Sequence, residues 1–191
     1  MNNSIVPGSL SQIAQQNNTG LAESFLGADY IIVLDMSGSM SSHDAPGGKS
    51  REQVAEEDVI HLQTMHKGKI ALFCFADYCI FAPGGVPLNC GGSTNMAAAL
   101  RYIQAADDCG SKIILVSDGM PNDASETLRI AREFKNKIDT IFCGPETDTE
   151  GGRAFLEKLA RATKGKSYQS DSPGLLGTSV EKLLLESPKD L

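Results

Sequence analysis

The stretch YIIVLDMSGSM, residues 30–40, joins a short apolar run to a loop rich in Asp and Ser. The run from Tyr30 to Leu34 is continuous and largely β-branched, which is typical of a strand buried on both faces of a parallel sheet. Ligands of such sheets bind outside the carboxyl ends of the strands. We therefore expect a binding site in the loop that begins at Asp35.

Apolar runs alternate with helix-like segments along the rest of the chain. Further strands are expected at residues 69–75, 78–81, 112–116, 138–143 and 166–169, and helices at 51–66, 94–106, 124–136, 153–163 and 175–185. This alternation predicts a layered α/β fold with a mostly parallel sheet. The run 78–81 is short and is followed closely by Pro83, so it is expected to form a hairpin strand at the sheet edge.

The length of 191 residues favours one domain with a substantial core. We assign residues 28–186 to this domain. Residues 1–27 are rich in Asn, Gln, Ser and Gly and are interpreted as an N-terminal extension, and residues 187–191 as a C-terminal tail.

Charge and cysteine content restrict the partners and the compartment. The formal net charge of -7 argues against nucleic acid and anionic membranes, which attract basic surfaces. No apolar run approaches the roughly 20 residues that span a bilayer, and the first basic residue is Lys49, so a positively charged signal flank is missing. The five cysteines form no CxxC pair and are expected to be reduced and mostly buried. Together these features predict a cytoplasmic protein.

Three oxygen-rich loops are expected to meet at the carboxyl ends of the strands. The first loop is DMSGSM at 35–40, the second is GGSTN at 91–95, and the third is SDGMPND at 117–123. Carboxylate and hydroxyl oxygens suit Mg²⁺, Mn²⁺ or Ca²⁺ better than zinc or copper. So few charged ligands would leave such a cation electrophilic and open to an incoming carboxylate.

The three loops resemble the metal-ion-dependent adhesion site (MIDAS) of von Willebrand factor A (vWA) domains, which combines D-x-S-x-S with a distant Thr and a distant Asp. The matching residues are Asp35, Ser37, Ser39, Thr94 and Asp118, and the resemblance covers about residues 29–185. It implies that the three hydroxyls ligate the metal, that the two aspartates bind it directly or through water, and that an acidic residue of the partner completes the octahedron.

The resemblance also implies an architecture and a function. The architecture is a three-layer α/β/α, Rossmann-like fold. Its doubly wound, mostly parallel sheet has the order 3-2-1-4-5-6 with one antiparallel edge strand. The function is that of a non-enzymatic adaptor or scaffold of the stand-alone intracellular microbial type. Its partner would be a protein that presents Asp or Glu, for example in an AAA+ ATPase or a kinase/phosphatase system. An extracellular adhesion domain and a complete but vestigial site are the variants left open.

Two other functional classes compete with this interpretation. Asp35, Lys112 and the pair Asp118/Asp123 imitate the layout of a haloacid dehalogenase-like, Mg²⁺-dependent phosphohydrolase. That family has a second Asp for acid–base work where this chain has Ser37. Residues 47–50, GGKS, imitate a phosphate-binding loop, but the pattern requires Gly where His43 stands. Asp123 is more simply interpreted as the cap of the following helix.

Overall fold

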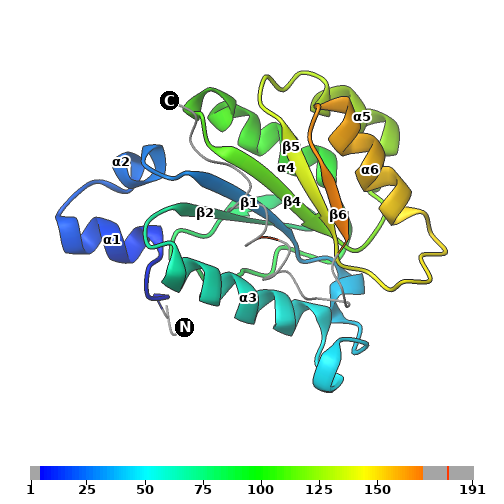
Figure 1. Cartoon of the computed structure of the whole chain (residues 1–191), viewed down its shortest axis with the longest axis horizontal. Helices are drawn as coiled ribbons and strands as arrows, with labels where there is room; N and C mark the ends of the chain where they lie inside the picture. The colour runs from blue at the N-terminus through cyan, green and yellow to red at the C-terminus, as the bar shows by residue number, and fades with distance from the viewer. Residues whose placement is uncertain (1–4, 170–179, 181–191) are drawn as a thin grey trace.

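The computed structural model describes residues 5–169 and Val180, and this part of the chain contains a six-stranded sheet (Figure 1). The strand order β3-β2-β1-β4-β5-β6 and the antiparallel pairing of β3 with β2 confirm the predicted topology. The other neighbouring strands pair in parallel. The strands are β1 (Tyr30–Asp35), β2 (Ile70–Phe75), β3 (Cys79–Phe81), β4 (Lys112–Ser117), β5 (Ile138–Phe142) and β6 (Ser167–Gln169).

Helices cover both faces of the sheet. The α-helices of the described residues are α1 (Leu10–Asn17), α2 (Leu21–Leu26), α3 (Arg51–Met65), α4 (Met96–Ile103), α5 (Ala124–Ala131) and α6 (Gly152–Ala162). Figure 1 shows α3 on one face and α4, α5 and α6 on the other. No helix in the described ranges combines the length and the apolar character needed to cross a membrane.

The alternating side chains of β1 explain the three layers. Ile31 and Val33 pack in one apolar cluster with α4 and α6, whereas Ile32 and Leu34 pack in a second cluster with α3. Both faces of β1 are therefore buried, which is the arrangement that its continuous apolar sequence predicts.

Two predicted helices are shorter in the structure. The segment 94–106 divides into α4 and a 3-10 helix at Gln104–Cys109. Helix α5 ends at Ala131, because the buried Asp107 carboxylate accepts the backbone N–H groups of Lys135 (2.7 Å) and Asn136 (2.9 Å) and holds them outside the helical pattern. The predicted helix at 175–185 lies outside the described residues except for Val180, which is helical and buried.

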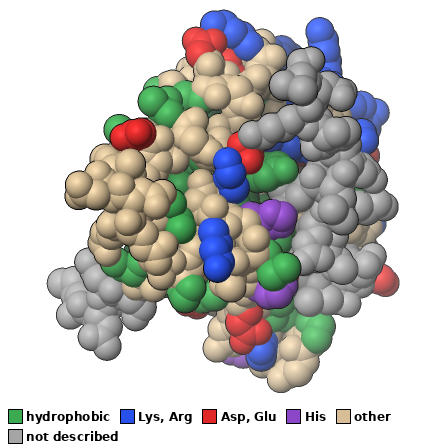
Figure 2. Space-filling view, turned by 60° about the vertical axis from the view of Figure 1, so that its left-hand side comes forward, with side chains coloured by type: hydrophobic (Ala, Val, Ile, Leu, Met, Phe, Trp, Pro, Cys, Tyr) green, Lys and Arg blue, Asp and Glu red, His purple; other side chains and the backbone are tan. Residues whose placement is uncertain are grey.

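From Ile5 onward, the predicted extension packs against the edge of the sheet. The backbone N–H of Val6 donates to the Gly84 carbonyl at 2.9 Å, and the ring of Phe25 lies edge-on against Phe73 and Phe81. Figure 2 brings this end of the molecule forward and shows a mostly uncharged surface with scattered Lys, Arg, Asp, Glu and His side chains. Covering the region beside the edge strand β3 protects unpaired backbone groups from pairing with another chain.

We expect Gly8→Ala to test this docking. Gly8 has a φ of +85°, and a Cβ atom there would lie 2.0 Å from the Gln63 carbonyl oxygen of α3. Left-handed strain and the backbone clash together should lower the free energy of unfolding by about 3 kcal/mol. The matched control is Gly47→Ala, where φ is +75° and no atom lies within 4 Å, so strain alone should cost about 1 kcal/mol. Chemical denaturation measures both, and equal losses would show that the approach of residue 8 to α3 does not stabilise the fold.

Candidate metal centre

The first loop makes direct hydrogen bonds to both of the other loops. The Gly38 N–H donates to the Gly92 carbonyl at 2.9 Å, and Ser39 Oγ donates to Asp118 Oδ1 at 2.7 Å. The loops follow different strands, and Ser39 and Asp118 are 79 positions apart in the chain. The three oxygen-rich loops therefore lie together at the carboxyl ends of the strands, as predicted.

Asp35 is completely buried at the end of β1. Its Oδ1 accepts the Ser37 N–H at 2.8 Å, and its Oδ2 accepts the hydroxyl of Ser117 at 2.6 Å. Burial raises the pKa of Asp35 to about 6, the hydrogen bonds from Ser117 and Ser37 oppose this rise, and the nearby Asp118 carboxylate adds to it. The ionised form of Asp35 is consequently costly unless a cation lies close to it.

Hydroxyl oxygens lie beside these two carboxylates. Ser37 Oγ and Ser39 Oγ are 3.1 Å apart, and the Ser39 hydroxyl donates a hydrogen bond to Asp118. A hydroxyl that donates to a carboxylate keeps its lone pairs available for another partner. The arrangement can therefore present neutral oxygen ligands to a cation while Asp118 holds one of them in orientation.

Thr94 is held beside the third loop by Asn122. The Thr94 N–H donates to Asn122 Oδ1 at 3.0 Å, the Asn122 N–H donates to the Thr94 carbonyl at 2.9 Å, and Asn122 Nδ2 donates to Ser93 Oγ at 3.1 Å. The Thr94 side chain is half-buried. Asn122, to which the motif assigns no role, therefore joins the second loop to the third.

Arg51 is a second residue that the motif does not identify. It begins α3, its side chain is 8% exposed, and its Nη1 donates to Asp118 Oδ2 at 2.5 Å. Its Nε and Nη2 donate to the two carboxylate oxygens of Asp44 at 2.8 and 2.5 Å. A guanidinium thus lies between a buried aspartate of the candidate site and a partly exposed aspartate on the adjoining loop.

The donor set fits a hard cation. Among residues 5–169 and Val180, no group of three or more His, Cys, Asp or Glu side chains is placed to hold a metal. The oxygens that converge here belong instead to two carboxylates, Asp35 and Asp118, and to the hydroxyls of Ser37 and Ser39. Such a set suits Mg²⁺ or Mn²⁺ and lacks the nitrogen and sulfur ligands that zinc prefers.

The phosphohydrolase layout is not assembled in full, because Lys112 does not join Asp35 and Asp118 at the site. Lys112 lies at the start of β4, at the opposite end of the strand from Asp118, and forms an ion pair with Asp139 at 3.1 Å. Asp123 accepts the backbone N–H of Glu126 at 2.9 Å, so it is the predicted cap of α5.

The segment that imitates a phosphate-binding loop has other contacts. Lys49 forms an exposed ion pair with Glu57 at 2.6 Å. Ser50 and Gln53 form a capping box at the start of α3. Both polar side chains of the GKS sequence therefore serve the local structure of α3.

The cysteines have the predicted environment. Cys74, Cys90 and Cys143 are buried, Cys79 and Cys109 are half-buried, and all are free thiols. Burial raises the pKa of Cys74 to about 12 and that of Cys90 to about 11. Thiols with such pKa values are poor nucleophiles at neutral pH.

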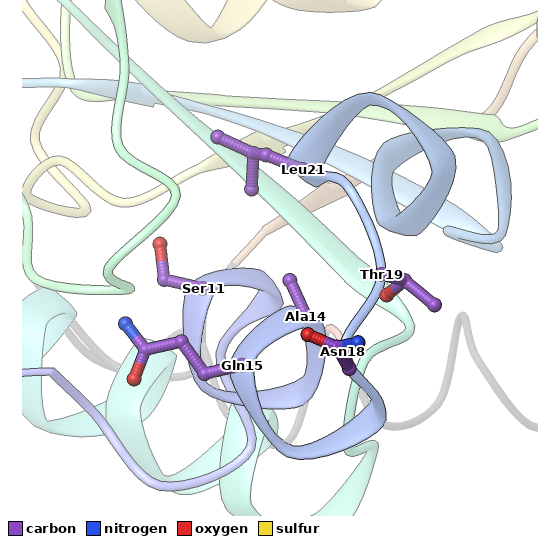
Figure 3. A pocket seen from close by; sticks show the side chains of 6 residues that line it. All are labelled: Ser11, Ala14, Gln15, Asn18, Thr19 and Leu21. Atoms are coloured by element: carbon purple, nitrogen blue, oxygen red, sulfur yellow. The ribbon is translucent and has the colours of Figure 1, made fainter.

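An open pocket of about 380 Å³ lies at α1 and α2 (Figure 3). Its lining residues are Ser11, Ala14, Gln15, Asn18, Thr19 and Leu21. None of these side chains titrates near neutral pH. The chain runs from α2 into the start of β1, whereas the candidate site follows the end of β1, so the pocket is separate from the site.

Similarity to known proteins is found at the level of structure. No protein-family model and no curated protein sequence matches the chain. Similar solved structures include an aerotolerance-related membrane protein of Bacteroides fragilis (TM-score 0.61, 14% identity, 84% of this chain and 100% of that one). BatB of Bacteroides thetaiotaomicron gives a TM-score of 0.61 at 15% identity, with 84% of this chain and 98% of that one covered. The manganese-loaded TRAP protein of Plasmodium vivax gives 0.57 at 17% identity, with 83% and 72% covered.

The structural matches, the strand order and the antiparallel edge together define the class. The matched structures belong to vWA-domain proteins, and this chain has the vWA fold.

Proposed function

We propose that the chain is a metal-dependent protein-binding module that coordinates an acidic side chain of its partner through a divalent cation. The metal ligands are Asp35, Ser37, Ser39, Thr94 and Asp118, bound directly or through water. The observation that carries this proposal is the direct hydrogen bonding of the first loop to the second and third loops.

The small negative charge of the ligand set would leave a bound cation electrophilic. Asp35 and Asp118 are the carboxylates of the ligand set. Asp118 also forms an ion pair with Arg51, so part of its negative charge is already compensated. A bound Mg²⁺ or Mn²⁺ would supply a Lewis-acidic centre for an incoming carboxylate. Mg²⁺ is our first choice, Ca²⁺ is an alternative, and the TRAP protein of similar fold is described as manganese-loaded.

We assign the module an adaptor role in a cytoplasmic assembly, without catalytic activity. The free thiols, three of them buried, support a reducing compartment. The acidic net charge supports a protein partner rather than nucleic acid. An AAA+ ATPase or a kinase/phosphatase system is the kind of assembly that we propose.

Thr94→Ala tests the proposal. Loss of one neutral oxygen ligand is expected to weaken Mg²⁺ binding about tenfold, because the site has few other ligands. Immobilised wild-type protein should retain a partner from a lysate of the source cells in Mg²⁺ and release it in EDTA, and Thr94→Ala should not retain it in Mg²⁺. The matched control is Thr64→Ala on the exposed surface of α3. A set of captured proteins that responds to neither EDTA nor Thr94→Ala contradicts metal-mediated binding.

A further inference from the structure

Arg51 has a contact that the proposed metal would also require. Both oxygens of Asp118 are occupied, Oδ1 by the Ser39 hydroxyl at 2.7 Å and Oδ2 by Arg51 Nη1 at 2.5 Å. The Asp118 side chain is 0% exposed, so bulk water does not replace these partners. The positive charge next to Asp118 in this structure therefore comes from Arg51.

Asp44 holds the guanidinium in this position. It accepts Nε and Nη2 of Arg51 in a two-pronged contact, which is the geometry that arginine forms best with carboxylates. The same contact lowers the pKa of Asp44, because the guanidinium favours its ionised form. The loop between these residues is tied back at its base by the Arg51 N–H, which donates to the Ser42 carbonyl at 3.2 Å.

We propose that Arg51 is a built-in competitor of the divalent cation for Asp118, an inference that rests on the proposed metal-dependent function. Arg51 compensates Asp118 while the metal is absent, and its charge repels a cation that enters beside it. The site therefore binds metal less tightly than its oxygen ligands alone would allow. In return, the bound cation keeps more of its positive charge for the carboxylate of the partner.

Titration of the purified, metal-free protein with Mn²⁺ in a calorimeter tests this inference. Arg51→Met removes the competing charge and is expected to raise the Mn²⁺ affinity about tenfold, while it lowers the melting temperature in EDTA. Arg51→Lys keeps the charge and should stay within about threefold of the wild-type affinity. A purely structural role for Arg51 would instead make the Met and Lys variants bind Mn²⁺ alike.

Asp44→Asn gives a second measurement, which leaves the Arg51 side chain in the protein and changes only the acid that pairs with it. Without the Asp44 carboxylate, the charge of Arg51 is less compensated, so Mn²⁺ affinity should fall about threefold. The control is Glu57→Gln, an exposed acid of α3 that pairs with Lys49 and should leave the affinity unchanged.

The outcomes separate the inference from the function on which it rests. If the wild type binds no Mn²⁺, the proposed function fails, and the competition fails with it. If the wild type binds Mn²⁺ but Arg51→Met binds it equally or more weakly, only the competition is overturned. If Arg51→Met does not fold, an Asp44→Asn affinity equal to that of the wild type overturns the competition on its own.

Discussion

Asp35→Asn is expected to stabilise the metal-free protein by about 2 kcal/mol at neutral pH and to abolish its stabilisation by Mg²⁺. The pKa of Asp35 rises from 3.8 to about 6 on folding, so keeping this buried group ionised at pH 7 costs about 3 kcal/mol. Asn carries no charge, but it cannot accept both of the hydrogen bonds that Asp35 accepts from Ser37 and Ser117. The loss of one acceptor offsets about 1 kcal/mol of the gain.

The sign of this effect depends on pH and on metal. A carboxyl group whose pKa is raised in the folded state contributes most to stability when it is protonated, and this contribution is lost as the pH rises through the folded pKa. The advantage of Asp35→Asn should therefore be absent near pH 4, grow through about pH 6 and then stay constant. In Mg²⁺ at about 100 times the dissociation constant, the wild type alone should gain about 2.7 kcal/mol, so the order of stability reverses.

Chemical denaturation in EDTA and in Mg²⁺ measures both halves of this prediction. The matched control is Asp123→Asn, which changes an exposed acid of the third loop that caps α5 and should keep the response to Mg²⁺. Unchanged Mg²⁺ stabilisation in Asp35→Asn would remove Asp35 from the metal site. A less stable Asp35→Asn protein in EDTA at pH 7 would show that burial of the charged carboxylate is not costly.

The sheet could be predicted because its signal is local. Each central strand is a continuous apolar run, and the parallel connections through helices leave few possible orders once the family resemblance is recognised. The end of α5 could not be predicted in this way. It depends on Asp107, which lies 28 positions before Lys135 in the chain and accepts its backbone N–H. Hydrogen bonds between distant segments leave no periodic pattern near the helix end that they determine.

The candidate site was predictable to a similar extent. The ends of neighbouring parallel strands meet, so Asp35 and Asp118 were expected to lie close together. The same argument predicts that Ser117 lies beside Asp35, because Leu34 of β1 is in register with Val116 of β4 and these two residues follow next. Arg51 has no comparable signal, since a single arginine at the start of a helix is usually exposed. Its burial follows from the path of the loop that brings Asp44 back over it.

Asp118→Ala is expected to destabilise the metal-free protein by about 3 kcal/mol, an effect opposite to that of Asp35→Asn. The substitution removes the partner of Arg51 Nη1 and leaves the buried guanidinium with Asp44 alone. Removing one member of a buried ion pair typically costs 3–5 kcal/mol, and the remaining contact with Asp44 places the expected loss at about the lower limit. Chemical denaturation in EDTA measures it.

The double variant Asp118→Ala/Arg51→Met separates this ion pair from general damage to the loop. If the loss in Asp118→Ala comes from an uncompensated guanidinium, removing that charge should recover about 2 kcal/mol, and the two single effects should not add. Additive losses would show that Arg51 and Asp118 contribute independently. Coupling of this size would mean that the two aspartates of the motif differ in how their negative charge is compensated. Ionised Asp35 lowers the stability of the fold unless a metal is bound. The charge of Asp118, in contrast, is compensated by Arg51 without a metal.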